Sequence, residues 1–162
     1  MKNNIAVIIL TFNEEIHLER CIKNVLKITS NIIVVDSYST DDTLKILKKY
    51  KIKFYQNKFT HQAAQVNYAL KNINIKAKWI FRIDSDEVIG DDFVKNIKKK
   101  LPFVKKDISG LEINKNLIFM GRYIKFGGVY PQKVVRVWKT GEGKYANTWM
   151  DEHIVLKNKK SF

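Results

Sequence analysis

The stretch Trp79-Ile80-Phe81-Arg82-Ile83-Asp84-Ser85-Asp86-Glu87 decides how this chain is interpreted. It begins as an apolar strand pattern and ends in two carboxylates, Asp84 and Asp86. Because successive side chains of a strand point to opposite faces, these two carboxylates point the same way. Mg²⁺ is usually held by one or two carboxylates together with substrate phosphates. The stretch therefore indicates a nucleotide diphosphate as the first ligand to consider, against the plain alternative of an acidic turn after a strand.

Apolar strands and amphipathic helices alternate through the first part of the chain. The sequence predicts strands over 5–10, 32–36, 53–55 and 79–84, and helices over 13–27, from about 43 to 50, over 62–70 and over 91–101. Ser39 or Thr40 is expected to cap the second helix. This alternation predicts an α/β fold with a mostly parallel sheet and helices on both faces. Ligands of such sheets bind outside the carboxyl ends of the strands, where Asn13, Asp36 and Asp84 lie.

The pattern changes after Pro102. Extended segments are predicted over 110–116, 117–126, 133–138 and 149–156, separated by glycine-rich turns. The lysine-rich tail from Lys157 is expected to be disordered or cut short. At 162 residues the chain is long enough for one domain with a real core.

Composition limits the classes of function. No apolar run approaches the roughly 20 residues of a membrane helix, and no signal peptide is evident, so we expect a cytoplasmic protein. The formal net charge is +14, but only four of the 30 basic residues are arginine. Lysine is poorly suited to bidentate recognition of bases, which disfavours a nucleic-acid-binding module, the alternative from another class. The single cysteine, Cys21, lies in a helical pattern and is expected to be a small buried residue.

Several other nucleotide and metal sites can be set aside. An EF-hand loop starting at Asp84 would have Val88 at its fifth position and Ile89 where the turn requires glycine. The chain has no Gly-x-Gly-x-x-Gly and no P-loop. A sugar-nucleotide pyrophosphorylase is expected to have a glycine-rich loop after its first strand, where this chain has residues 11–15.

Four short motifs in one order resemble family 2 glycosyltransferases. They are Ile-Leu-Thr-Phe-Asn-Glu-Glu at 9–15, Val-Val-Asp-Ser-Tyr-Ser-Thr-Asp-Asp-Thr at 34–43, Ile-Asp-Ser-Asp-Glu at 83–87 and Met-Asp-Glu-His at 150–153. The resemblance covers roughly residues 5–155. Within the family, these motifs and Gly-Gly-Val-Tyr-Pro at 127–131 make the chain most similar to the bacterial branch that adds sugars to lipopolysaccharide core, lipooligosaccharide or capsule.

The resemblance implies a GT-A fold and an inverting sugar transfer from a nucleotide diphosphate, with Mg²⁺ or Mn²⁺. Transferred position by position, it implies that Thr11, Phe12 and Glu14 line the nucleotide, that Asp36 approaches base and ribose, and that Asp84 and Asp86 serve the diphosphate and the metal. Many relatives carry a second acidic residue where this chain has Ser37, so the contact with the base and the identity of the nucleotide are open.

An attacking acceptor hydroxyl must lose its proton to a positioned base, and Asp151 and Glu152 are the candidates. Relatives often carry His-Glu here, which makes Glu152 the preferred base and Asp151 the alternative. His153 and His61 are weaker contact candidates. Trp138 and Trp149 are expected to pack in the core rather than to stack on a sugar.

These expectations describe a single GT-A domain over residues 1–162. Its nucleotide-sugar half spans about 1–101 and its acceptor half spans about 102–156, and we expect the C-terminus to be truncated. The expected partners are a nucleotide-diphospho-sugar, with UDP-sugar first, and a lipid-linked or lipopolysaccharide-type acceptor, with no nucleic acid. Attachment to the inner face of an anionic membrane would be electrostatic. Because the chain stops soon after the base, we expect donor binding with weak transfer.

Overall fold

The central element is one seven-stranded sheet with the order β11-β5-β8-β4-β1-β2-β3. The structure is a computed structural model that describes residues 4–126, 132–146 and 153–161. The parallel part contains β1 (Ile5–Thr11), β2 (Ile32–Asp36), β3 (Lys53–Gln56) and β4 (Trp79–Asp84). The remainder contains β5 (Ile108–Lys115), β8 (Gln132–Lys139) and β11 (Lys159–Ser161), with β8 antiparallel to both of its neighbours.

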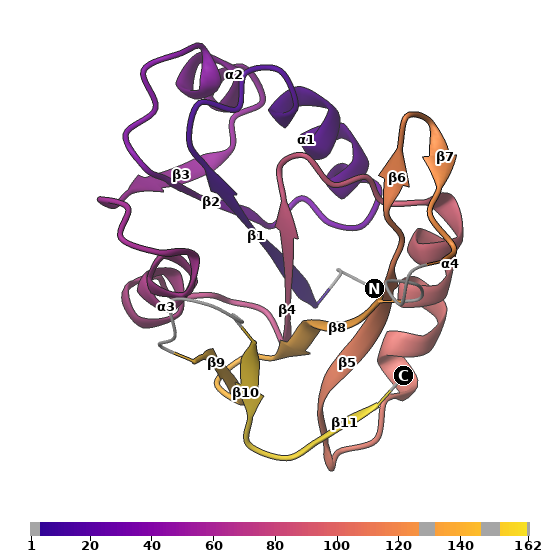
Figure 1. Cartoon of the computed structure of the whole chain (residues 1–162). Coiled ribbons are helices and arrows are strands. Elements are labelled where there is room, and N and C mark those ends of the chain that lie inside the picture. Colours follow the sequence, from indigo (N-terminus) through magenta and orange to yellow (C-terminus); the bar gives the residue numbers. More distant parts are fainter. Residues whose placement is uncertain (1–3, 127–131, 147–152, 162) are drawn as a thin grey trace.

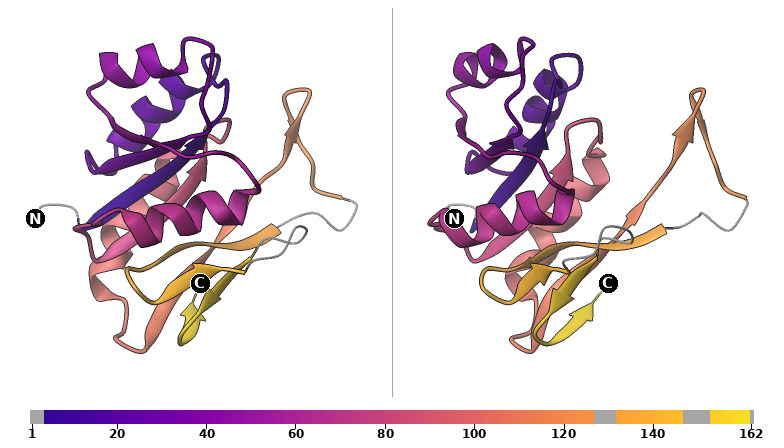
Figure 2. Two further views of the ribbon diagram at one scale, coloured as in Figure 1. Left: turned by 90° about the vertical axis from the view of Figure 1, so that its left-hand side faces the viewer. Right: turned by 60° about the vertical axis from the view of Figure 1, so that its left-hand side comes forward.

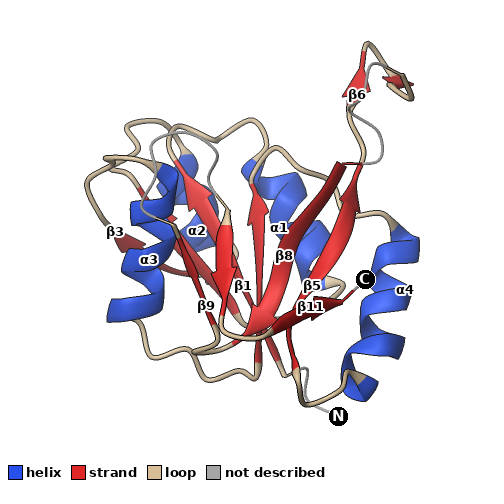
Figure 3. Ribbon diagram, turned by 60° about the horizontal axis from the view of Figure 1, so that its bottom comes forward, coloured by secondary structure: helices blue, strands red, loops and turns tan. Residues whose placement is uncertain are grey.

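Helices cover both faces of the sheet, as predicted (Figures 1 and 3). They are α1 (Leu18–Leu26), α2 (Thr43–Lys49), α3 (Gln62–Asn72) and α4 (Asp91–Lys100), which continues into the 3-10 turn η1 (Leu101–Phe103). Alternate residues of β1 feed two cores. Val7 and Ile9 pack with α1, α2 and α4, whereas Ala6 and Ile8 pack with α3 and the hairpin of β9 (Gly143–Tyr145) and β10 (Ile154–Leu156). Both faces of β1 are buried, so every position of the strand favours an apolar side chain. This explains the continuous apolar run at 5–10.

The first helix begins five residues later than the sequence predicted. Asn13 has a φ of 53°, in the left-handed region, and the turn that follows it delays α1 until Leu18. The backbone amides of this turn donate to side chains of the loop after β2 and of the first residue of α2. Glu14 donates to the Thr43 hydroxyl at 2.8 Å and Glu15 to the Asp41 carboxylate at 3.0 Å. The turn is therefore held by a tertiary contact that periodicity does not encode.

The predicted cap of α2 was wrong. The N-cap position is Asp42, which makes no capping hydrogen bond with its side chain. Asp41 instead accepts a hydrogen bond from the Thr43 amide at 3.0 Å, while the Ser39 hydroxyl donates to Asp36. Ser39 serves the strand ends rather than the helix, because its hydroxyl donates to the Asp36 carboxylate and accepts from the Asn13 amide at 2.9 Å.

The described residues of the second half match the predicted extended segments with three differences. The tail from Lys157 is predicted to be disordered or cut short; the disorder is contradicted, because β11 pairs in parallel with β5 at the edge of the sheet. The three-residue strand β9 begins at the last glycine of the Gly-Glu-Gly turn at 141–143 and pairs with β10. The segment 117–126 is not one extended strand but a small hairpin of β6 (Ile118–Phe119) and β7 (Arg122–Tyr123). Figure 2 shows this hairpin projecting away from the sheet and helices.

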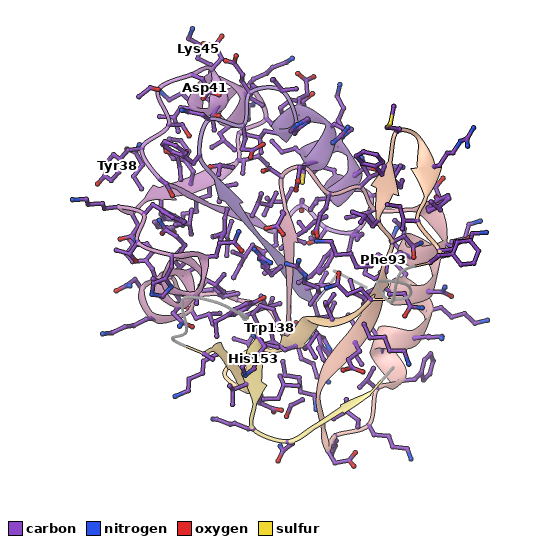
Figure 4. The ribbon with its side chains drawn as sticks, viewed as in Figure 1. Tyr38, Asp41, Lys45, Phe93, Trp138 and His153 are labelled. Carbon is purple, nitrogen blue, oxygen red and sulfur yellow. The ribbon has the colours of Figure 1, made fainter. Side chains whose placement is uncertain are left out.

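Two single-residue predictions are confirmed. Cys21 is fully buried on α1, and Trp138 is fully buried on β8 with its ring edge against Tyr145 at a centroid distance of 6.1 Å. Figure 4 labels Trp138 among the interior side chains. Within the described part of the chain, no helix has the length and apolar character needed to cross a membrane.

Candidate active site

The strand register brings the predicted nucleotide residues to one edge of the sheet. β1 lies between β2 and β4, so Thr11 stands opposite Asp36 and Leu10 stands opposite Asp84. Thr11, Asp36 and Asp84 each end a parallel strand. The carboxyl edge of the three central strands therefore carries a hydroxyl and two carboxylates from segments far apart in sequence.

Asp36 is fully buried and accepts hydrogen bonds from the ends of two other strands and from one loop. Its carboxylate accepts from the Thr11 hydroxyl at 3.0 Å, from the Ser39 amide at 3.0 Å and hydroxyl, and from the Gln56 amide group at 3.2 Å. A buried carboxylate is tolerated only when it is bonded in this way. Asp36 thus ties β1, β2 and β3 together at the edge where its proposed ligand would lie.

Ser37 belongs to a second polar network beside Asp36. Its hydroxyl accepts from the side-chain amide of buried Gln65 at 3.0 Å, and the same nitrogen donates to the Asn57 carbonyl at 2.9 Å. The Asn57 side chain returns a hydrogen bond to Gln65 at 2.8 Å. Serine at this position is therefore an acceptor for α3.

Two exposed aromatic side chains lie on the loops that leave β1 and β2. Phe12 is 59 % exposed and Tyr38 is 55 % exposed. Tyr38 has a φ of 61°, a conformation that costs of the order of 1 kcal/mol or more for a residue other than glycine and that concentrates at functional sites. Figure 4 shows Tyr38 reaching outward from this loop. Glu14 is partly buried, and its carbonyl accepts from the Leu18 amide at 2.9 Å.

Asp84 is held between two arginines. Arg82 pairs with one carboxylate oxygen, and Arg136 approaches the other at 3.2 Å. Arg136 also lies 3.2 Å from Glu87, which in turn pairs with Lys115 at 2.6 Å. The network joins β4 to β8 and β5, and it leaves the buried Arg82 Nε and Arg136 Nη1 without a partner among the described residues.

The electrostatic setting of Asp84 combines opposed effects. The pKa of its carboxyl is raised to about 6 in all: burial raises the pKa most, Arg82 lowers it, and the nearby negative charge of Glu87 raises it. A carboxylate in this setting gains from any additional cation, because a positive charge relieves both the desolvation and the repulsion.

Asp86 is exposed, and within the described residues its carboxylate takes part in no hydrogen bond or ion pair; only its backbone carbonyl is used, by Arg20 at 3.0 Å. Asp84 and Asp86 therefore offer hard oxygen ligands, one partly engaged and one open. No group of three or more metal-binding side chains occurs among the described residues. The set fits a cation that takes one or two carboxylates and completes its shell with phosphate and water.

The predicted catalytic pair lies outside the described residues. Asp151, Glu152 and Trp149 fall in 147–152, and the Gly-Gly-Val-Tyr-Pro stretch falls in 127–131. His153 is exposed just before β10 and is labelled in Figure 4. His61 is the N-cap of α3, and its Nδ1 accepts from the Ala64 amide at 3.1 Å.

Sequence reasoning missed the basic partners of the acidic cluster. Arg82 could have been found, because it stands two residues before Asp84 and so shares its face of the strand. Arg136 could not, because it reaches Asp84 only through the antiparallel pairing of β8 with β4. Glu87 accepts from the Asp84 amide at 3.0 Å, so it closes the turn as well as carrying charge.

Acidic and polar side chains at the carboxyl ends of central parallel strands are the arrangement by which α/β proteins of this class bind ligands. The chain belongs to glycosyl transferase family 2, whose family model matches residues 6–147. Among curated relatives, the lipopolysaccharide core biosynthesis glycosyltransferase LpsC of Rhizobium meliloti is 27 % identical over 146 residues, which cover 87 % of this chain and 53 % of LpsC. An uncharacterised glycosyltransferase of Rickettsia typhi is 33 % identical over 94 residues, which cover 58 % of this chain and 32 % of that protein. The chain thus spans about half of the first relative and a third of the second.

Solved structures confirm the predicted GT-A fold. Glucosyl-3-phosphoglycerate synthase from Mycobacterium tuberculosis, solved in complex with UDP, superposes with a TM-score of 0.55 at 21 % identity, covering 67 % of this chain and 43 % of the synthase. TarS from S. aureus gives a TM-score of 0.55 at 20 % identity and covers 86 % of this chain and 47 % of the TarS chain. The same synthase has also been solved with Mn²⁺, UDP and phosphoglyceric acid.

Proposed function

We propose that this protein transfers a sugar, with inversion, from a nucleotide-diphosphate donor to a bacterial cell-surface glycan or glycolipid. The observation that carries the proposal is the register of β4, β1 and β2, which aligns Asp84, Thr11 and Asp36 along one edge of the sheet. Family membership supplies the reaction class.

A UDP-sugar is the proposed donor. Support comes from the synthase of the same fold, which was solved with UDP and with Mg²⁺ or Mn²⁺. Phe12 and Tyr38, exposed on adjacent loops, offer aromatic surfaces for a base, and the Asp36 network holds those loops in place. Glu14 is retained from the family motif as a proposed nucleotide contact.

Asp84 and Asp86 are the proposed ligands for Mg²⁺ or Mn²⁺. A bound divalent cation would act as a Lewis acid that neutralises the charge developing on the leaving diphosphate. Arg82 and Arg136 orient the Asp84 carboxylate through ion pairs to its two oxygens. Their unpartnered buried N–H groups supply further positive potential at this edge, which favours phosphate binding.

The acceptor hydroxyl needs a carboxylate base, and Glu152 is proposed for that role with Asp151 as the alternative. An acceptor of the lipopolysaccharide type is supported by the likeness to LpsC, which extends over 87 % of this chain.

The metal site is tested by thermal unfolding with UDP. A ligand that binds only the folded state raises the unfolding temperature, so UDP with Mn²⁺ should stabilise the protein much more than UDP with EDTA. Asp86→Asn should abolish the metal-dependent part. Asp107→Asn, an exposed aspartate elsewhere, is the matched control and should behave as the wild type. Equal shifts in Mn²⁺ and EDTA would refute the assignment.

The base is tested by the rate of UDP release from the UDP-sugar that the protein turns over. A positioned base contributes roughly 10² to 10⁴ in rate, so Glu152→Gln should slow turnover by that order while the donor dissociation constant stays nearly unchanged. Asp151→Asn should be the milder change. A loss confined to Asp151→Asn would reverse the assignment, and full activity in both variants would remove this motif from the mechanism.

A further inference from the structure

The β6–β7 hairpin exposes an unusual concentration of apolar side chains. Ile118 is 56 % exposed, Phe119 65 %, Met120 87 % and Tyr123 59 %, and Phe126 beyond the hairpin is 86 % exposed. Figures 2 and 3 show the hairpin standing clear of the sheet and helices. A loop that faces water usually carries polar residues. These exposed apolar side chains therefore indicate that the hairpin contacts a membrane or another protein.

The tip of the hairpin carries an apolar residue in a backbone conformation that usually selects a polar residue or glycine. Met120 and Gly121 connect the strands with φ values of 49° and 74°, and such two-residue turns strongly prefer Asn-Gly or Asp-Gly. Methionine at a positive φ is costly, yet it occupies the most exposed position of the hairpin. The sequence therefore keeps an apolar tip where turn chemistry would favour a polar one.

The two faces of the hairpin discriminate between a bilayer and a protein partner. Ile118 stands opposite Tyr123, and Phe119 stands opposite Arg122, so large apolar side chains occupy both faces as well as the tip. A hairpin that packs on a protein usually presents one apolar face and one polar face. Apolar side chains on both faces suit a medium that surrounds the hairpin.

The charge near the hairpin favours an anionic surface. Residues 116–126 contain Arg122 and Lys125 and no acidic residue, within a chain of net charge +14. Basic residues close to an anionic bilayer are attracted to its headgroups, while apolar side chains enter the boundary below them.

We propose that the β6–β7 hairpin inserts its tip into the interfacial layer of an anionic bilayer. From Leu117 to Met120 the strand advances by about 10 Å, which matches the roughly 5–10 Å depth of interfacial insertion. The hairpin connects β5 and β8, which carry Lys115 and Arg136 of the acidic cluster, so insertion brings the site to the membrane surface. This proposal goes beyond the proposed function and does not depend on it. It adds an apolar contribution to the electrostatic attachment expected from sequence.

Co-sedimentation with phosphatidylglycerol-containing vesicles tests the proposal. Replacing Phe119 and Met120 by Ser should lower partitioning at least about ten-fold, because two large apolar side chains no longer leave water. The matched control is Phe103→Ser, since Phe103 is 84 % exposed on η1 outside the hairpin, and it should bind as the wild type does. The UDP-dependent thermal shift should be unchanged in both variants, which separates failure of this proposal from failure of the proposed function.

The depth of insertion is tested with single tryptophan substitutions. Phe119→Trp should show blue-shifted fluorescence that brominated lipids quench, whereas Phe103→Trp should show neither change. Part of the binding should survive high salt, because burial of apolar area is not screened. Equal vesicle binding by the wild type and the double Ser variant would overturn the proposal. So would an unquenched Phe119→Trp, or a self-association that the double Ser variant abolishes, which would assign the hairpin to a second copy of the chain.

Discussion

Three aspartates along one edge of the sheet differ in what surrounds them. Asp36 is saturated by protein donors, Asp84 is shared between two arginines, and Asp86 is open to solvent. The carboxylate of Asp36 therefore holds loops together, that of Asp84 is part of a charge network, and that of Asp86 offers free oxygen ligands. Burial and partners decide between these roles, because the cost of an ionised carboxylate depends on how well it is solvated or paired.

Glu19 links α1 to α2 and should make stability depend on pH. Hydrogen bonds from Lys23 first, then from Tyr50 and Lys49, lower the pKa of Glu19 from 4.5 to about 2. The Tyr50 hydroxyl donates at 2.7 Å. Because the folded-state pKa is lower than the unfolded one, the stabilisation is present above about pH 4.5 and is lost as the pH falls through about 2. Glu19→Gln should therefore lower the urea midpoint at neutral pH and much less in acid.

A double-mutant cycle separates the interhelical bond from general effects of charge. Tyr50→Phe removes only the hydroxyl donor, so the coupling between Glu19→Gln and Tyr50→Phe should be measurable at neutral pH and shrink towards acid. A coupling that stays constant with pH would contradict the assignment.

At the scale of elements, the β9–β10 hairpin is packed against β8 through a glycine. A Cβ added at Gly143 would lie 2.9 Å from Cδ1 of Trp138 and 2.9 Å from Cδ1 of Ile154. The Trp138 ring is fully buried and has no room to move. This close approach explains why the first residue of β9 is a glycine, although Gly-Glu-Gly at 141–143 has the composition of a turn.

Gly143→Ala should lower the free energy of unfolding by about 1–3 kcal/mol, the usual cost of overpacking a well-filled core. Chemical denaturation measures the change. Gly90→Ser is the control, because a side chain there meets nothing within 4 Å and serine is acceptable at the N-cap of α4. A denaturation midpoint for Gly143→Ala that equals the wild-type value would show that the hairpin shifts away from Trp138 at little cost.

At the scale of the whole molecule, net charge should influence stability. A formal charge of +14 makes the folded state repel itself, and added salt screens that repulsion. Salt also weakens favourable ion pairs, but among the described residues the four pairs between helix side chains are exposed and worth little. The four partly buried pairs around Asp84 and Glu87 are screened much less. The unfolding temperature should therefore rise between low and physiological ionic strength, by roughly 2–4 °C for about 1 kcal/mol.

A charge-reduced variant provides the control for the salt effect. Changing the exposed residues Lys58, Lys71 and Lys76 to Gln should raise the unfolding temperature at low salt and flatten its dependence on salt. An unfolding temperature that falls with salt in the wild type would show that the favourable ion pairs outweigh the general repulsion.

The sequence by itself determined the parallel half of the sheet, its helices and the family. Long apolar runs and helical periodicity are local signals, and the motifs at 9–15, 34–43 and 83–87 keep their order along the chain. The boundaries were less well predicted where a loop is held from a distance, as in the turn after Asn13, which bonds to side chains near Ser39.

Only the tertiary structure decided which charges meet. Arg136 reaches Asp84 across 52 residues of sequence, and β11 joins β5 although its lysines resemble a solvated tail. It also decided that 117–126 folds back as a projecting hairpin, with apolar side chains on both faces. Strand pairing between distant segments depends on register and on what each strand buries, and neither is written in the local spacing of residues.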